Sequence, residues 1–357
     1  MLIQSGAFLS RKTVLIVGNF LSAAGYNRSF CEDLAERLRA ARWSVITTSC
    51  KPNRLVRLMD MVTTAWRRRN EYEVAQVDVF SGPAFFWAEA VCWILRKADK
   101  PYILTLHGGN LPQFARRYPR RVSNLLNSAA AVTTPSRYLL EQMKAYRSDI
   151  LLLPNAIDLS RYRFRLRQRA QPRLIWLRAF HSIYNPTLAP WMLAQLASDF
   201  PDIHLIMVGP DKGDGSLQKT LQVTEKLGLS SRITFPGGVP KSAVPEWLDK
   251  GDIFINTTNV DNTPVSVIEA MACGLCVVST NVGGIPYLLE HEKDALLVPA
   301  NDAEAMAKAV HRILTESGLT EHLSSNARKK AEQFDWSAVL PQWDRLLEMV
   351  KGMRQHA

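Results

Sequence analysis

Short, continuous apolar runs alternate with longer amphipathic segments along almost the whole chain. Continuous apolar character is typical of parallel strands that are buried on both faces, and the segments between them have the 3.6-residue period of helices. The first series of expected strands covers residues 14–17, 43–47, 77–80, 102–106, 130–133 and 150–153. The second series covers residues 174–177, 203–208, 233–235, 253–256, 276–279 and 295–298. The pattern predicts an α/β protein with two Rossmann-like, doubly wound parallel sheets.

Two such series also predict two domains, because 357 residues exceed one typical domain. We expect the division between residues 1–165 and 166–336. Near the join, arginines occupy positions 161, 163, 165, 167 and 169, with apolar residues between several of them. This period of two fits an edge strand, either as a solvated linker or as a basic lip at a ligand site.

Residues 259–284 carry the densest group of candidate chemical residues, in the stretch NVDNTPVSVIEAMACGLCVVSTNVGG. Pro264 is a natural entry residue for the helical pattern that follows it, and a helix N-terminus is a ready anion site. Asp261 lies on the loop before this helix, and Glu269 lies about one turn further in. The layout suits a polyol and a phosphate held together, although an ordinary helix with solvated acids would have the same local pattern.

The same stretch resembles the signature of the retaining family-4 glycosyltransferases, in which two glutamates separated by seven residues precede an EAMACGxPVV run. Glu269 matches the second acid, and residues 271–274 match the run. Asp261 stands where the family has its first Glu, and Cys276 stands where it usually has Pro. Because Asp is one methylene shorter, its reach is about 1.5 Å less, which leaves the donor sugar open.

This resemblance implies the GT-B architecture, in which two domains face each other across a cleft. Residues 1–165 would form the acceptor-side domain together with a crossover helix over 337–357, and residues 166–336 would bind the donor. The implied activity is transfer of a hexosyl group from a nucleotide sugar to a glycan or lipid-linked acceptor, with retention at the anomeric carbon. Glu269 would hold ribose hydroxyls, and Asp261 would hold the donor sugar. Further implied donor contacts are Asn262, Thr263, Pro264, Val265 and Ser266.

Two residues at strand ends match further motifs of the family. His107 ends a strand and precedes two glycines, in the crevice where α/β proteins bind ligands; a purely structural His would have the same pattern. Arg178 matches the Arg that contacts the donor diphosphate, so we assign both residues to the catalytic site. The Lys that the family has five residues after this Arg is Ile183 here, and His181 and Lys212 are the candidates to replace it.

Turns after other strands complete the expected donor site. Gly25 and Tyr26 lie in the first strand-to-helix loop, where the family often has a Gly-Gly pair; a plain structural turn fits equally well. In the second domain, Gly209 and Lys212 follow one strand, and Val239 lies in a Pro-Gly-Gly-Val-Pro turn. That turn presents backbone groups to the nucleotide base in the resembling proteins. Backbone recognition of this kind would leave little trace of the base in side chains, so the choice among uracil, guanine and adenine stays open.

The net charge of +11 is concentrated in the first half of the chain. Residues 1–172 carry a net +15 and residues 173–357 a net −4, so we expect an anionic partner for the first half. Residues 54–69 place apolar side chains on one helical face with arginines beside it, and further arginines occupy 116, 117, 120 and 121. This fits a helix lying on an anionic membrane, or a core-facing helix with a charged rim. We expect a cytoplasmic protein, with peripheral attachment to the inner face of the membrane as an option.

Other features limit the function classes. The first residues lack the order of a secretory signal, and the best membrane-spanning candidate, residues 83–95, is too short and contains Glu89. No GxGxxG follows the first strand of either series, which disfavours a dinucleotide-dependent dehydrogenase. The Cys273–Cys276 pair has no second pair or His cluster.

No Asp-x-Asp site follows an expected strand, so we expect no metal and no other cofactor, the nucleotide sugar being a substrate. Three alternatives stay open: a non-catalytic nucleotide-binding scaffold, a nucleotide-sugar 2-epimerase of the same fold, and, less favoured, a nucleic-acid binder that uses the basic half.

Overall fold

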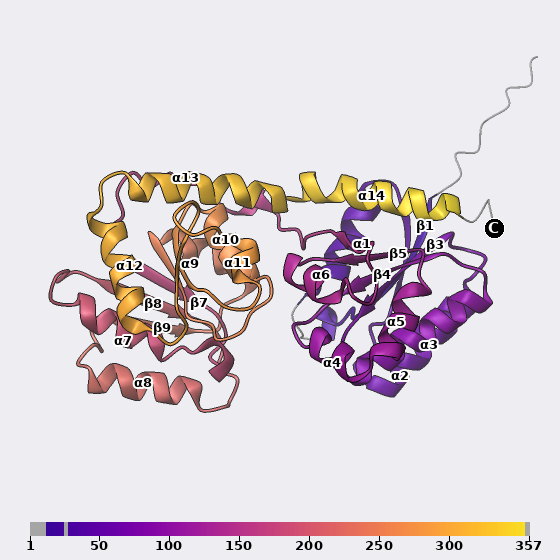
Figure 1. Ribbon diagram of the computed structural model, residues 1–357, viewed down its shortest axis with the longest axis horizontal. Helices are drawn as coiled ribbons and strands as arrows, with labels where there is room; N and C mark the ends of the chain where they lie inside the picture. Colours follow the sequence, from indigo (N-terminus) through magenta and orange to yellow (C-terminus); the bar gives the residue numbers. More distant parts are fainter. Residues whose placement is uncertain (1–11, 25–27, 354–357) are drawn as a thin grey trace, which may run out of the picture. The chain divides into compact units, whose positions relative to one another are not determined.

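A computed structural model describes residues 12–24 and 28–353 of the chain, which forms two compact units. The first unit comprises Met1–Pro135, Leu139–Asn155 and Val339–Ala357. The second comprises Ser136–Tyr138 and Ala156–Ala338. Each unit is built on a six-stranded sheet with helices around it (Figure 1). The expected donor residues Gly25 and Tyr26 lie outside the described residues.

The first sheet has the strand order β2-β1-β3-β4-β5-β6, and its neighbouring strands are parallel. Its strands are β1 (Thr13–Val17), β2 (Ser44–Thr48), β3 (Val74–Val79), β4 (Tyr102–Leu106), β5 (Ala131–Thr134) and β6 (Leu151–Leu152). The helices of this part of the chain are α1 (Phe30–Ala40), α2 (Arg54–Arg67), α3 (Pro83–Lys97), α4 (Leu111–Arg117), α5 (Pro119–Asn127) and α6 (Arg137–Met143), with the 3-10 turn η1 (Ser22–Ala24).

The second sheet has the order β12-β11-β10-β7-β8-β9 and is also parallel. Its strands are β7 (Arg173–Leu177), β8 (His204–Val208), β9 (Ile233–Gly237), β10 (Ile253–Asn256), β11 (Cys276–Thr280) and β12 (Leu296–Val298). The helices are α7 (Leu188–Leu196), α8 (Ser216–Lys226), α9 (Val244–Asp249), α10 (Val265–Ala272), α11 (Ile285–Leu288), α12 (Ala303–Thr315) and α13 (Leu319–Ala331). The 3-10 turns are η2 (Leu159–Arg161), η3 (Ser182–Tyr184), η4 (Lys241–Ala243) and η5 (Glu332–Phe334).

The continuous apolar character of the strands has a direct cause in the second unit. Successive residues of β7 enter two different apolar clusters: Leu174 and Trp176 pack with α7 and α12 on one face. Ile175 and Leu177 pack with α10 on the other face. Because both faces of the sheet are covered, neither set of side chains can be polar. All twelve expected strands are present, and the largest shift is at β3, which starts three residues before the expected position 77.

The last helix, α14 (Trp336–Gly352), begins in the second unit and belongs to the first unit from Val339 onward. Within the first unit, Trp43 Nε1 donates a hydrogen bond to Asp344 Oδ1 at 2.8 Å. Lys12 Nζ lies 2.7 Å from Glu348 Oε1. Polar contacts therefore fix the second half of α14 beside β1 and β2.

The expectation of an edge strand at the arginine-rich join is wrong. Residues 162–172 have irregular backbone after the η2 turn. Tyr162 and Arg167 are buried, whereas Phe164 and Leu166 are exposed, so apolar and polar residues do not separate onto two faces. The physical reason is that the guanidinium groups of this segment find buried acceptors in the second unit, which fixes the backbone without a strand partner.

Candidate functional site

The candidate site lies at the carboxyl ends of β7 and β10 in the second unit. The chain proceeds from β7 to β8 and β9 on one side and then returns to place β10 on the other side of β7. Open α/β sheets bind ligands at such a switch point, beyond the carboxyl ends of the strands. Arg178 follows β7 directly, and the loop with Asp261 follows β10. The fold thereby brings together residues that are far apart in the sequence.

Arg178 and Asp261 form an ion pair between Nη2 and Oδ2. The guanidinium also lies over the ring of Tyr184, 4.3 Å from its centroid. Burial lowers the pKa of Arg178, against the opposing effects of Tyr184 and Glu269, and the ion pair with Asp261 favours the charged form of the guanidinium. Arg178 Nε has no hydrogen-bond partner within the described residues. One buried donor of this arginine is therefore ready for a ligand.

A polar relay fixes the loop that carries Tyr184. Trp176 Nε1 donates to Thr257 Oγ1 at 2.9 Å, and Thr257 Oγ1 donates in turn to the Tyr184 carbonyl at 2.7 Å. The relay connects β7, the residue after β10 and η3. The surface against which Arg178 packs is therefore set by the sheet itself.

Glu269 lies on α10 with a side chain that is only 3% exposed. Its Oε1 accepts a hydrogen bond from Tyr162 Oη at 2.6 Å and contacts Lys241 Nζ on η4. Burial raises the pKa of Tyr162, and the nearby Glu269 carboxylate raises it further, so this phenol stays a proton donor. A carboxylate that is held in place on a helix is suited to accept hydrogen bonds from paired hydroxyls.

The N-terminus of α10 has no side-chain cap. Pro264 precedes its first turn with extended backbone, φ −69° and ψ 114°. Ser266 Oγ in that turn and Asn259 Oδ1 in the loop before it are buried, and neither has a partner within the described part of the chain. Uncapped N–H groups at the positive end of a helix attract anions. Orphaned polar atoms around them are typical of a ligand site.

The expected donor residues Asn262, Thr263 and Val265 are half-buried in the loop and first turn that lead into Glu269. Asn262 N donates to Asp261 Oδ1 at 2.9 Å. Gly284 approaches this loop so closely that a Cβ on it would lie 1.8 Å from the Asn262 carbonyl oxygen. Only glycine therefore fits at 284, beside the loop that leads into α10.

The remaining residues of the second unit that we expected to contact the nucleotide sugar lie in neighbouring loops. A Cβ on Gly209 would lie 1.6 Å from the Arg178 carbonyl oxygen, so this glycine lets the turns after β7 and β8 touch. Lys212 N donates to the Phe180 carbonyl at 3.2 Å, and its side chain is exposed. Val239 follows β9 and packs against the apolar cluster under α10.

His181 does not point its Nδ1 at a ligand position, because this atom accepts a hydrogen bond from Ile183 N at 3.1 Å. Ile183, at the position of the family's Lys, is 39% exposed. Lys241 is a cation that the sequence did not indicate, and it touches Glu269 from a different turn.

His107 belongs to the first unit, where it follows β4. Its Nε2 lies 3.0 Å from Asp78 Oδ1, and its ring stacks on Phe80 with 5.1 Å between centroids. Asp78 also accepts a hydrogen bond from Gln76 Nε2 at 2.8 Å. The ring orientation of His107 is thus fixed from two sides, as both a structural and a ligand-contacting histidine require.

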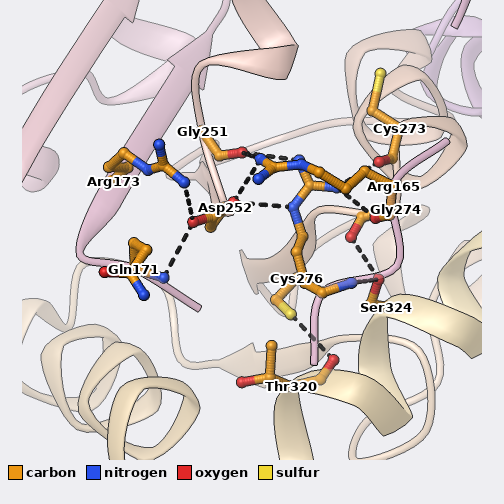
Figure 2. A network of polar contacts seen from close by, with 11 residues as sticks. Arg165, Gln171, Arg173, Gly251, Asp252, Cys273, Gly274, Cys276, Thr320 and Ser324 are labelled. Atoms are coloured by element: carbon orange, nitrogen blue, oxygen red, sulfur yellow. Dashed lines mark hydrogen bonds and ion pairs between the residues drawn. The ribbon is translucent and has the colours of Figure 1, made fainter. Parts of the chain in front are cut away.

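A network of buried polar contacts anchors the segment after Tyr162 (Figure 2). Asp252 Oδ1 accepts hydrogen bonds from Arg165 Nη2 at 2.7 Å and from Arg167 Nε at 3.2 Å. Its Oδ2 accepts hydrogen bonds from Arg173 Nη2 at 2.8 Å and from the Gln171 backbone N–H at 3.0 Å. Burial alone would raise the pKa of Asp252, but these donors outweigh it, and the pKa lies below its ordinary value.

Arg167 extends this network to the backbone around α10. Its side chain is 2% exposed and donates to the carbonyl oxygens of Gly251, at 2.8 Å, and of Cys273. Cys273 is the C-cap residue that directly follows α10. The same network therefore fixes both the end of the helix that carries Glu269 and the segment that carries Tyr162.

The Cys273–Cys276 pair lies beside this network rather than at a ligand position. Burial raises the pKa of both thiols to about 12, so both remain protonated at neutral pH. Among the described residues, no group of three or more His, Cys, Asp or Glu side chains is arranged to hold a metal ion. None of the helices in that part of the chain has the length and apolar content that a membrane crossing needs.

Two family descriptions match the chain. Glycosyltransferase Family 4 matches residues 13–161, and Glycosyl transferases group 1 matches residues 169–330. The chain belongs to these glycosyltransferases. The resemblance that residues 259–284 carry is thereby confirmed, and the two matches divide the chain close to the join between its two sheets.

Curated relatives and solved structures agree with this family. D-inositol 3-phosphate glycosyltransferase of Mycobacteroides abscessus is 29% identical over 45% of this chain and 36% of the relative. Phosphatidyl-myo-inositol mannosyltransferase of Mycolicibacterium smegmatis is 26% identical over 59% of this chain and 55% of the relative. The chain thus aligns with about a third to just over half of the length of these relatives.

The structure of Anabaena HepE in complex with UDP has a TM-score of 0.75 to this chain, with 18% identity, covering 95% of this chain and 100% of that one. This likeness confirms the predicted fold of two parallel-sheet domains, the GT-B fold.

Proposed function

We propose that this glycosyltransferase-family chain transfers a hexosyl group from a nucleoside-diphosphate sugar to a glycan or lipid-linked saccharide. The observation that carries the proposal is the convergence of Arg178, Asp261 and Glu269 with the uncapped start of α10 at the switch point of the second sheet. Each group suits one part of the donor. A buried arginine and a helix N-terminus suit a diphosphate, and buried carboxylates suit the hydroxyls of two sugars.

The roles follow from position. Glu269, held by Tyr162, binds the ribose hydroxyls. Arg178 binds the diphosphate through its unpartnered Nε and stabilises the charge that develops on it as it leaves. Asp261 then exchanges part of its ion pair with Arg178 for hydroxyls of the transferred sugar. For His107 we propose the role that the family resemblance implies, contact with the donor sugar.

The proposed chemistry retains the anomeric configuration. The bond between the anomeric carbon and the β-phosphate oxygen breaks, and the acceptor oxygen bonds to the same face of that carbon. The acceptor hydroxyl proton passes to the leaving phosphate, so no protein nucleophile is needed. The step also needs no metal, because Arg178 and α10 supply the positive field. Full activity in the presence of a chelator would support this, and loss that magnesium restores would refute it.

Release of nucleoside diphosphate from a panel of UDP-, GDP- and ADP-sugars tests the proposal. The native chain should release one nucleotide, slowly with water as acceptor, and the Glu269→Ala variant should lose this release. Removing a hydrogen bond to a charged group typically costs about 1.5–3 kcal/mol, so donor affinity should fall roughly 10- to 150-fold. Trp191→Ser, on an exposed position of α7 away from the site, is the matched control.

The alternatives give different results in the same assay. An epimerase alters the donor sugar without releasing nucleotide or needing an acceptor. A scaffold would bind the nucleotide, as calorimetry can measure, but would release no nucleotide from any donor in the presence of candidate acceptors. If the native chain bound no nucleotide, the switch point of the second sheet would not be a donor site.

A further inference from the structure

The outer face of α2 and α3 in the first unit is unusually apolar for a protein surface. On α2, Leu55, Val56, Met59 and Trp66 are 75%, 50%, 61% and 43% exposed. On α3, Phe86 and Trp93 are 54% and 53% exposed. We call these six residues the α2–α3 face. Single exposed apolar side chains are ordinary, but six on two helices that pack against each other mark an interaction surface.

The packing of α2 shows why this face points outward. Its buried residues are Arg57, Met61 and Ala65, so the most regular apolar stripe of the helix is not its core-facing side. Arg57 donates to the carbonyl oxygens of Lys51 and Pro52, at 2.8 and 2.7 Å. The side chain of Asn53 caps the helix start by accepting from two backbone N–H groups. These bonds fix the rotation of α2 and leave its apolar stripe exposed.

Cations accompany the aromatic residues of the face. Arg69 lies 4.4 Å from the ring centroid of Trp66, and Lys97 lies 5.9 Å from that of Trp93. An aromatic ring with a cation beside it suits the boundary between lipid tails and phosphate headgroups, where the ring is half-buried and the cation reaches the phosphate. Both ends of α2 carry further exposed arginines, Arg54 and Arg67.

A groove of about 550 Å³ lies between α2, α3 and α5, next to this face. Val62, Ile94 and Leu125 contribute apolar walls, and Glu89 and Arg121 form an ion pair at its edge. Because Arg121 neutralises Glu89, the only carboxylate lining the groove does not oppose an anionic ligand. The exposed face and the groove together give an apolar surface within a positive rim.

We propose that the first unit docks on an anionic lipid bilayer through the α2–α3 face, with Trp66 and Trp93 at the headgroup level. The face could be covered by a bilayer or by a second copy of the chain, and the charge of the first unit favours the bilayer. The residues of the first unit (1–135, 139–155 and 339–357) include 24 Lys and Arg against 13 Asp and Glu, a net +11. Two copies joined at this face would therefore repel one another, whereas anionic headgroups attract it. The inference rests on the first unit alone and does not depend on the proposed transfer.

Co-sedimentation of the full chain with vesicles tests the inference in the absence of any donor. The vesicles are pure phosphatidylcholine, or phosphatidylcholine mixed with phosphatidylglycerol. The chain should sediment with the mixed vesicles at low salt and leave them at high salt. Trp66→Ser should weaken binding roughly tenfold. Trp191→Ser is the matched control, since Trp191 is 42% exposed on α7 of the second unit, and it should bind like the native chain.

A pair of charge variants separates electrostatic from apolar attraction. Arg54→Glu combined with Arg67→Glu should weaken binding by at least about thirtyfold, at about fivefold for each lost arginine. Lys219→Glu combined with Lys226→Glu on the exposed side of α8 changes the net charge equally and should have little effect. Thermal unfolding verifies that each variant is folded.

Three results would overturn the inference: equal binding to neutral and anionic vesicles, native binding by the folded Trp66→Ser variant, or a dimer in solution that this substitution dissociates. The last result would identify the face as an interface between copies. Nucleotide binding measured in the same variants is a separate readout, so a failure of membrane docking is distinguishable from a failure of the donor site.

Discussion

Two buried carboxylates of the second unit, Asp252 and Glu269, differ in how completely their surroundings satisfy them. Asp252 receives three guanidinium groups and a backbone N–H. Glu269 receives one phenol and one lysine that is 60% exposed, and orphaned polar atoms lie in the preceding turn and loop. A saturated carboxylate has no capacity left for a ligand, whereas a partly satisfied one does. From this difference we propose that Asp252 serves stability and Glu269 serves binding.

The largest effect that tests this contrast is expected from Asp252→Asn. Removing one member of a buried charge network typically costs about 3–5 kcal/mol, because the partner charge stays buried. Arg167, at 2% exposure, is that partner. Urea unfolding should show this loss, while the folded variant should still bind nucleotide. A variant that kept its stability but lost nucleotide binding would reverse the two assignments.

Acid should remove the contribution of the Asp252 carboxylate to the stability of the native chain. The folded-state pKa of Asp252 lies below its ordinary value of 3.8. The contribution is therefore fully present above the ordinary value and is lost as the pH falls through the lowered folded pKa. The stability difference between the native chain and Asp252→Asn should shrink below about pH 4. A difference that stayed constant down to acid unfolding would show that the Asp252 charge does not matter.

On the binding side of the comparison, Arg178→Lys should weaken nucleotide-sugar binding by roughly 10- to 100-fold. A lysine cannot bond a phosphate in two places or stack on Tyr184 as a planar guanidinium does. Stability should change little, because the cation facing Asp261 is kept. Calorimetric titration of the nucleoside diphosphate measures the effect. Arg232→Lys, at a half-buried position just before β9, is the control. Unchanged affinity would remove Arg178 from the phosphate site.

Local sequence was sufficient to place Asp261 before a helix start and Glu269 on that helix, because the spacing of both acids around one helix start is a short-range pattern. It was also sufficient for the strands, since burial on both faces leaves only apolar residues. It could not reveal Tyr162, which contacts Glu269 across 107 residues. Nor could it reveal the carboxylate that binds two arginines of the join together with Arg173 of β7. It also could not determine which side of α2 faces the core, because an apolar stripe fits a core and a membrane equally well. The buried residues of α2 proved to include a charged one, Arg57, beside Met61 and Ala65.

The smallest effects compare the two partners of Glu269. Tyr162→Phe removes a buried hydrogen bond at 2.6 Å and should raise the KM for the donor about fivefold to tenfold, at about 1 kcal/mol for such a bond. Lys241→Met removes a contact made by a mostly exposed side chain, and pairs of this kind contribute about 0–1 kcal/mol. Its effect should be smaller than that of Tyr162→Phe. A larger effect of Lys241→Met would instead show that the lysine contacts the donor itself. It would then replace the Lys that the family has at the position of Ile183.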